Sequence, residues 1–183
     1  MENQIKRLDR RLEFEGAIVD FYTDTVELPD GRTAKWDYIS HRKGAAAVVP
    51  VTADGKILMV HQYRNALDRM TIEIPAGARD SVTEDTRDTA ARELEEETGY
   101  RCGHLEKMLS LKTTVAFCNE FIDVYLATEL TPGRQQLDPD EYIDIKAYEP
   151  QELLDKIYAG IIQDGKTVAG ILAYCYRYGN KIE

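Results

Sequence analysis

The chain has 183 residues and a formal net charge of −10 at pH 7. This length suits one domain with a full hydrophobic core, while the negative charge argues against a large nucleic-acid-binding surface. No apolar run approaches the length of a membrane span, and the first residues lack the apolar segment of a signal peptide. Three widely separated cysteines are typical of reduced thiols rather than of a disulfide framework or a zinc site. We therefore expect a cytoplasmic protein without a nucleic-acid or membrane partner.

The N-terminal segment predicts a meander of antiparallel strands. Residues 12–23 and 24–28 are rich in strand-forming side chains, Pro29-Asp30-Gly31 indicates a turn, and residues 33–41 form the return strand of a hairpin. Trp36 lies on that return strand and is the only tryptophan of the chain. Its simplest interpretation is an aromatic side chain of the core or of an interface.

A continuous apolar run over residues 45–52 predicts a buried strand. Asp54-Gly55 indicates a turn, and residues 57–63 form the paired strand, which runs into Gln62-Tyr63-Arg64. A guanidinium at this place suits phosphate, because its fork donates two parallel hydrogen bonds. A surface ion pair is the alternative. We interpret His61 as structural, because a lone histidine is not a set of metal ligands.

The segment Glu73-Ile74-Pro75-Ala76-Gly77 predicts a short, bent connection. Its proline and glycine favour a bend that turns a backbone carbonyl toward the following helix. Backbone carbonyls are ordinary ligands of hard divalent cations, so this connection is a candidate part of a metal site.

The following helix is expected to begin with Thr83 as its N-cap and to end before Gly99. Glu84 and Asp85 then lie in the first turn, where the helix dipole favours negative charge. Gly99 can take the positive φ of a C′ residue. A small apolar face is formed by Ala90, Ala91 and Leu94.

The same helix carries four carboxylates within five positions, at Glu93, Glu95, Glu96 and Glu97. Like charges at i,i+3 and i,i+4 spacing cost about 0.2–0.5 kcal/mol per pair on an exposed helix. Arg92 can offset part of this cost by pairing with Glu96 one turn later. A hard divalent cation would offset the rest. A plain solvated face is the alternative interpretation.

The remaining residues predict a mixture of strands, loop and helices. We expect two strands, an acid-rich loop, a last strand and two helices, in this order, over residues 107–113, 121–128, 130–141, 142–148, 149–158 and 166–177. The final helix places Val168, Ile171, Leu172 and Cys175 on one face, which we expect to pack on the sheet.

One motif carries a family resemblance. Glu84, seven further residues and then Arg92-Glu93-Leu94-x-Glu96-Glu97-x-Gly99-Tyr100 resemble the signature of the Nudix hydrolases. The family glycine would fall at Ala78, whereas Gly77 lies one residue earlier, so the loop before the helix is one residue longer than the pattern. The resemblance implies an α/β protein, a Nudix-type α/β/α sandwich around a mixed sheet with an N-terminal antiparallel β-meander.

Three further features resemble the ADP-ribose pyrophosphatase-like subgroup: the N-terminal meander, the Gln-Tyr-Arg and Glu-Ile-Pro-Ala-Gly segments, and the loop Leu-Thr-Pro-Gly-x-Gln-x-Leu-Asp-x-Asp-Glu over residues 130–141. The resemblance implies a homodimer in which residues 1–43 form a dimerisation subdomain and residues 44–183 the Nudix hydrolase domain. One departure concerns Val115 and Ala116, which stand where the subgroup carries a Ser-Pro-Gly-like segment.

The resemblance also implies roles for individual residues. Mg²⁺, or Mn²⁺ in its place, would be held by Ala76 through its carbonyl and by Glu93, Glu96 and Glu97. Arg92 would orient this set, and Glu141 would be the general base, with Asp138 and Asp140 as alternatives. Substrate-binding roles fall on Trp36, as a wall on which adenine stacks, and on Arg64, Glu73 and Glu120.

These residues together predict an enzyme for the metal-assisted hydrolysis of a phosphate ester or anhydride. The family resemblance implies that it hydrolyses the diphosphate bond of a nucleoside diphosphate derivative with Mg²⁺. The subgroup resemblance implies ADP-ribose as the substrate, cleaved to AMP and ribose 5-phosphate. Two alternatives stay open. The proline of the Ser-Pro-Gly-like segment is absent here, which favours a Nudix hydrolase for another nucleotide sugar or a dinucleotide. The longer loop motivates a binding or sensor domain that kept the fold without catalysis.

Overall fold

The computed structural model describes residues 4–139 and 141–179. The chain divides into two compact units. We call them the meander unit, which comprises the N-terminal residues through Gly44 together with Lys112–Phe121, and the sandwich unit, which comprises Ala45–Leu111 and the residues from Ile122 onward.

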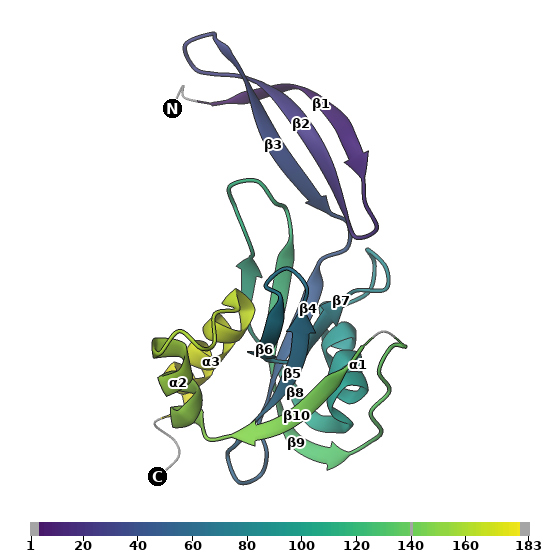
Figure 1. Ribbon diagram of the computed structural model, residues 1–183, viewed down its shortest axis with the longest axis vertical. Helices are drawn as coiled ribbons and strands as arrows, with labels where there is room; N and C mark the ends of the chain where they lie inside the picture. Colours follow the sequence, from purple (N-terminus) through teal and green to yellow (C-terminus); the bar gives the residue numbers. More distant parts are fainter. Residues whose placement is uncertain (1–3, 140, 180–183) are drawn as a thin grey trace. The chain divides into compact units, whose positions relative to one another are not determined.

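The meander unit is an antiparallel sheet of the strands β1 (Lys6–Glu15), β2 (Val19–Glu27) and β3 (Thr33–His41), in that order (Figure 1). The expected division into strands 12–23 and 24–28 is wrong, because the chain turns at Gly16. The Gly16 N–H donates to the Val19 carbonyl over 3.0 Å. A Cβ at this position would lie only 2.4 Å from that same oxygen, so the turn requires a glycine.

A second part of the chain joins the meander unit. The segment Lys112–Phe121 runs beside β3, where the Ile39 N–H donates to the Phe117 carbonyl over 2.7 Å. The His41 N–H donates to Oδ1 of Asn119, also over 2.7 Å. Residues distant in sequence therefore complete this unit.

The sandwich unit contains two sheets. One has the order β7-β4-β9-β8, with β4 parallel to β9 and antiparallel to β7, and the other is the antiparallel sheet β10-β5-β6. The strands are β4 (Ala45–Pro50), β5 (Ile57–Arg64), β6 (Arg69–Glu73), β7 (Ala76–Ala78), β8 (Tyr100–Lys112), β9 (Phe121–Pro132) and β10 (Ile143–Tyr148). The expected bent connection at residues 73–77 thus joins two short strands. β8 begins earlier than residue 107, and β9 extends beyond residue 128.

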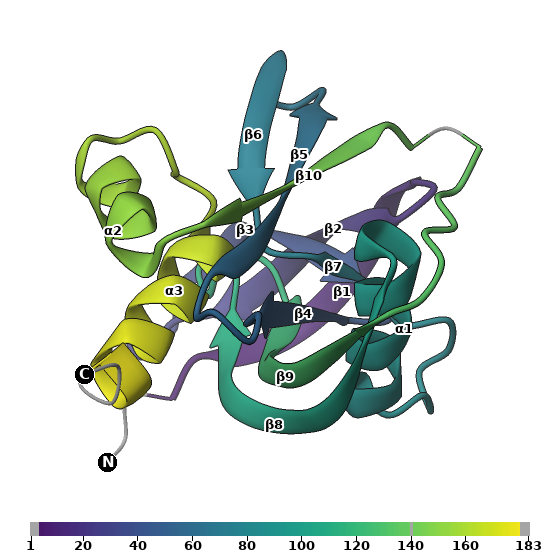
Figure 2. The same ribbon diagram turned by 90° about the horizontal axis from the view of Figure 1, so that it is seen from below.

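The helices α1 (Thr86–Thr98) and α3 (Gly165–Tyr178) lie on opposite sides of β4 (Figure 2). Successive side chains of a strand point to opposite faces, and both faces of β4 are buried. Ala46 and Val48 pack in one cluster with Ala90 and Leu94 of α1, and the other cluster contains the neighbours Ala47 and Val49 with Ile171 and Tyr174 of α3. The α/β/α sandwich around a mixed sheet is thereby confirmed. The helix α2 (Pro150–Tyr158) precedes α3.

The ends of α1 correct one expectation and confirm another. The N-cap is Asp85 rather than Thr83, and its Oδ1 accepts the Arg87 N–H over 2.9 Å. Glu84 therefore precedes the helix instead of lying in its first turn. Gly99 ends the helix with a φ of 71° and donates its N–H to the Glu95 carbonyl, as expected. Ala91 and Leu172, which we expected on packed faces, are exposed.

The three cysteines are free thiols. No helix within residues 4–139 and 141–179 is long and apolar enough to span a membrane.

Candidate active site

The carboxylate of Glu97 is buried where α1 faces β7. Its Oε2 accepts the N–H of Ala76 over 3.0 Å, and the residue is only 3 % exposed. The neighbouring strand residue Gly77 lies against Glu93: a Cβ there would be 2.1 Å from Cδ of Glu93. β7 can approach the two glutamates this closely because position 77 has no side chain.

Burial raises the pKa of both of these glutamates. The pKa of Glu97 is raised to about 8, and the negative charges of Glu93 and Glu141 act in the same direction. The pKa of Glu93 is raised to about 7 although Arg92 opposes the shift. Two desolvated carboxylates that repel each other are costly in water-free surroundings unless a cation joins them. Their environment therefore fits a positively charged ligand.

Arg92 links the residues around these carboxylates. Its Nη1 donates to Oε1 of Glu93 over 2.8 Å and to Oε2 of Glu96 over 3.0 Å. Its Nη2 donates to the Ala78 carbonyl over 3.1 Å and lies 3.6 Å from a carboxylate oxygen of Glu84. Arg92 thus ties α1 to the loop that precedes it.

That loop is the one that is longer than the family pattern. Glu84 closes it by accepting the Asp80 N–H over 2.5 Å. Nη1 of Arg79 donates to the carbonyls of Val82 and Glu84 over 2.9 and 3.0 Å. The additional residue is accommodated between Gly77 and Glu84, outside α1.

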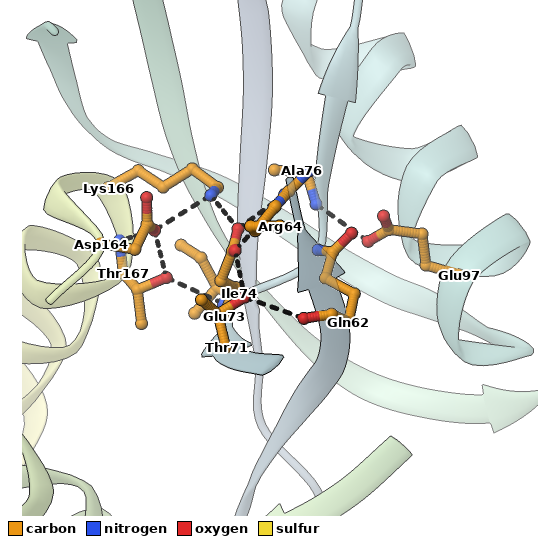
Figure 3. Close-up of polar contacts among 10 residues, drawn as sticks. All are labelled: Gln62, Arg64, Thr71, Glu73, Ile74, Ala76, Glu97, Asp164, Lys166 and Thr167. Carbon is orange, nitrogen blue, oxygen red and sulfur yellow. Dashed lines mark hydrogen bonds and ion pairs between the residues drawn. The ribbon is translucent and has the colours of Figure 1, made fainter. Parts of the chain in front are cut away.

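Arg64 and Glu73 form a second charged group (Figure 3). Nε and Nη2 of Arg64 donate to the two oxygens of Glu73, each over 2.7 Å. Lys166 and Thr71 also donate to Glu73, over 2.5 and 2.7 Å. Burial by itself would raise the pKa of Glu73, but these hydrogen bonds and positive charges outweigh it and lower the pKa to about 2. Arg64 therefore pairs with a buried acid, and not with a surface one.

This charged group is electrostatically linked to α1. The bond to Glu73 raises the pKa of Arg64, and the negative charge of Glu97 adds to that effect. The positive charge of Lys166 in turn opposes the rise in the pKa of Glu97. The cations and the buried carboxylates of the sandwich unit thus act on one another.

The acidic loop after β9 places Glu141 within electrostatic reach of α1, since its charge contributes to the raised pKa of Glu93 and Glu97. Within the loop, the Glu141 N–H donates to the Asp138 carbonyl over 3.0 Å, and the Asp138 N–H donates to Oε2 of Glu141 over 3.2 Å. Asp140, an alternative base, lies outside the described residues.

Trp36 and Glu120 belong to the meander unit, whereas the other predicted site residues belong to the sandwich unit. Trp36 is 47 % exposed, which excludes the core interpretation. It lines a hollow of about 390 Å³ with Lys35, Asp37, Ala116 and Phe117. Oε1 of Glu120 lies 3.5 Å from Nε2 of His41.

The sequence model of the NUDIX domain family matches residues 41–168, which contain α1 with its glutamates and Arg92. The chain belongs to the Nudix hydrolase family.

This Nudix protein is similar over most of its length to two bacterial proteins. One is a methanol dehydrogenase activator of Bacillus methanolicus, 42 % identical over 160 residues that cover 86 % of this chain and 85 % of the relative. The other is an ADP-ribose pyrophosphatase of Bacillus subtilis strain 168, 38 % identical over 168 residues that cover 91 % and 90 %. The crystal structure of an ADP compounds hydrolase has a TM-score of 0.89 over 100 % of this chain and 98 % of that one, at 15 % identity, and thus shares the fold.

Sequence reasoning missed several residues of the charged group around Glu73, namely Thr71, Asp164, Lys166 and Thr167. A signal existed for one of them, because Asp164 precedes a predicted helix and has the character of an N-cap. Lys166 and Glu73 are 93 positions apart. No spacing rule could have paired them.

The donor set of this Nudix site fits a hard divalent cation. Glu93 and Glu97 are carboxylates in a desolvated, mutually repulsive arrangement, and Mg²⁺ prefers such oxygen ligands. In their present positions, no three His, Cys, Asp or Glu side chains of the described residues form a metal-binding group. Arg92 and the Ala76 N–H are their partners instead.

Proposed function

We propose that this Nudix hydrolase cleaves the diphosphate bond of ADP-ribose to AMP and ribose 5-phosphate with the help of Mg²⁺. The pair of desolvated glutamates on α1, the partly buried Glu93 and the buried Glu97, beside the cations around Glu73, carries the proposal. A site with both features has an anionic part for a metal ion and a cationic part for phosphate. The similarity to the ADP-ribose pyrophosphatase of Bacillus subtilis supports the choice of substrate.

The proposed ligands of Mg²⁺, or of Mn²⁺ in its place, are Glu93, Glu96, Glu97 and the carbonyl of Ala76. When bound, the metal ion neutralises phosphate oxygens and lowers the pKa of a water molecule. The part of Arg92 is to orient Glu93 and Glu96, with which its guanidinium already forms hydrogen bonds.

The proton of the attacking water goes to Glu141 in this proposal. Its loop position allows the side chain to change partners, because among residues 4–139 and 141–179 its Oε2 accepts a hydrogen bond only from a backbone N–H of the same loop. Arg64 binds the diphosphate through the N–H donors that Glu73 leaves available. Asp138 is the alternative base.

The proposed place for the adenine ring is the hollow beside Trp36. Two half-exposed aromatic side chains, Trp36 and Phe117, border that hollow, and stacking of a base on an aromatic ring is worth roughly 1–3 kcal/mol. A substrate-binding role for Glu120 and a homodimer formed through residues 1–43 complete the proposal.

A measurement of AMP release tests the proposal directly. Purified protein is incubated with ADP-ribose in the presence of Mg²⁺ and then of EDTA. We expect AMP and ribose 5-phosphate only with the metal. Glu97→Gln should lower kcat about 100-fold or more, since a metal ligand is lost. Glu95→Gln is the matched control, because Glu95 is on the same helix and pairs with Arg101.

Three results would contradict the proposal. Turnover of another nucleotide sugar or a dinucleotide without turnover of ADP-ribose would keep the hydrolase and change its substrate, an outcome that Val115 and Ala116 motivate. No turnover of any such compound would favour the sensor domain. Unchanged turnover by Glu97→Gln would disprove the metal assignment.

A second candidate function is activation of a dehydrogenase. The relative of Bacillus methanolicus with 42 % identity, named for the activation of methanol dehydrogenase, favours it. The test is the rate of a purified methanol dehydrogenase with and without this protein. An increase that Glu97→Gln abolishes would link activation to hydrolysis, and no increase would exclude this candidate for that enzyme.

A further inference from the structure

Two cations share the buried carboxylate of Glu73. The residue is 2 % exposed, and its Oε2 accepts hydrogen bonds from both Nη2 of Arg64 and Nζ of Lys166. Thr71 donates to the other oxygen. A buried carboxylate without a compensating cation strongly destabilises the fold. If one of the two cations binds another anion, the other is therefore needed to compensate the charge of Glu73.

The two cations differ in their access to a ligand. The Arg64 side chain is 42 % exposed, whereas that of Lys166 is 10 % exposed. Glu73 uses two of the five N–H donors of the guanidinium. Lys166 instead lies between two protein carboxylates, 2.5 Å from Glu73 and 2.9 Å from Asp164. Arg64 is therefore suited to reach a ligand, and Lys166 to hold Glu73.

The first turn of α3 fixes Lys166 in this place (Figure 3). Asp164 is the N-cap, and its Oδ2 accepts the N–H and the hydroxyl of Thr167 over 3.0 and 2.6 Å. The Thr167 hydroxyl oxygen in turn accepts the N–H of Ile74, the residue after Glu73. The start of α3 is thus bound to the residue that follows β6, which holds Lys166 beside Glu73 independently of Arg64.

We propose that Lys166 is a positioning residue that acts through Glu73 to free Arg64 for the diphosphate of the substrate; this inference rests on the proposed function. When a diphosphate draws the guanidinium, Lys166 keeps the buried carboxylate compensated. Without Lys166, Arg64 is the one cation that the described part of the chain pairs with Glu73, so the carboxylate competes with the substrate for it. Lys166 itself does not contact the substrate.

A double-mutant cycle tests this proposal. KM and kcat are measured for the parent, Lys166→Met, Glu73→Gln and the double variant. We expect Lys166→Met to raise KM about tenfold with kcat within about twofold, since substrate binding is what weakens. In the Glu73→Gln background, where no buried anion is left to compensate, the same change should have no further effect on KM. Lys166→Arg should restore KM because it retains the charge.

Lys156→Met is the matched control, since Lys156 pairs with Glu152 on α2. It should leave KM unchanged. Where Lys166→Met fails to fold, as judged by its thermal melting curve, Lys166→Gln removes the charge and keeps a donor for Glu73. An unchanged KM in Lys166→Met and Lys166→Gln would overturn the proposal.

An equal rise of KM in the parent and the Glu73→Gln backgrounds would also overturn it, because Lys166 would then act without Glu73, on the substrate directly. The cycle can use any nucleoside diphosphate derivative that the parent hydrolyses. A result that disproves ADP-ribose as the substrate can therefore be distinguished from one that disproves the role of Lys166. A parent that hydrolyses no such compound would overturn both.

Discussion

At the residue scale, Gly77 is the point where β7 and the carboxylate of Glu93 come closest. Gly77→Ala would place a Cβ 2.1 Å from Cδ of Glu93. The carboxylate must then move, and misplacement of about 1 Å costs about 100-fold in rate. We expect kcat for ADP-ribose to fall by about this factor. Gly165→Ala is the control, since an added Cβ there meets no atom within 4 Å. If Gly77→Ala hydrolysed ADP-ribose as fast as the parent, the close approach of Gly77 to the Glu93 carboxylate would be contradicted.

Glu73 makes the fold sensitive to acid. Its pKa in the folded protein, about 2, is below the ordinary value of 4.5. The ionised form therefore stabilises the fold fully above about pH 4.5, and this contribution is lost as the pH falls toward about 2. Its size is on the order of 3 kcal/mol.

The measurement is the free energy of unfolding in urea for the parent and Glu73→Gln. We expect the free energy of unfolding of the parent to exceed that of Glu73→Gln by about 3 kcal/mol near pH 7, and this difference to be smaller near pH 3. Glu152→Gln, which breaks a surface pair with Lys156, should change stability by less than about 1 kcal/mol at either pH. A gap that does not depend on pH would show that Glu73 does not titrate in this way.

Prediction from sequence at this scale depends on local spacing. The glutamates of α1 and Arg92 lie within one helix, so their grouping follows from the residue order. The desolvation of Glu93 and Glu97 does not, because it depends on the packing of β7 against α1. Lys166 was missed for the same reason, since its partner Glu73 is distant in sequence.

At the scale of single elements, the start of α1 gives a discriminating pair of variants. Asp85 accepts the Arg87 N–H as the N-cap, whereas Thr83 precedes the helix. Asp85→Ala should lower the free energy of unfolding by about 1 kcal/mol, and Thr83→Ala should change it by less than about 0.5 kcal/mol. Chemical denaturation of both variants decides between the two caps. A larger loss for Thr83→Ala would contradict the observed helix start.

The elements that sequence reasoning placed well are those with a strong local pattern. α1, α3 and the buried strand β4 have such a pattern. β7 has only three residues, too few for any alternation to be visible, and it exists because it pairs with β4. The boundary between β1 and β2 was misplaced because strand-forming side chains continue up to and beyond Gly16. Tertiary pairing decides these cases.

At the scale of the whole molecule, a metal ion should act as a stabilising ligand. A ligand that binds only the folded state stabilises it by about 2.7 kcal/mol at 100 times Kd. For a chain of this length each kcal/mol raises Tm by roughly 2–4 °C. We therefore expect Mg²⁺ to raise Tm and EDTA to reverse the shift.

The Tm shift is measured by differential scanning fluorimetry, with NaCl of equal ionic strength as the control. Glu97→Gln should lose the shift because a proposed ligand is gone. An equal shift in parent and variant would place the bound ion elsewhere.

The segment Lys112–Phe121 has a consequence for how this protein can be recombined with its relatives. It leaves the sandwich unit after β8, pairs with β3, and returns at β9. A chimaera that exchanged only the residues before Ala45 would place a foreign β3 against the native segment Lys112–Phe121. To exchange the complete meander unit, both of its separate stretches of sequence must therefore be transferred together.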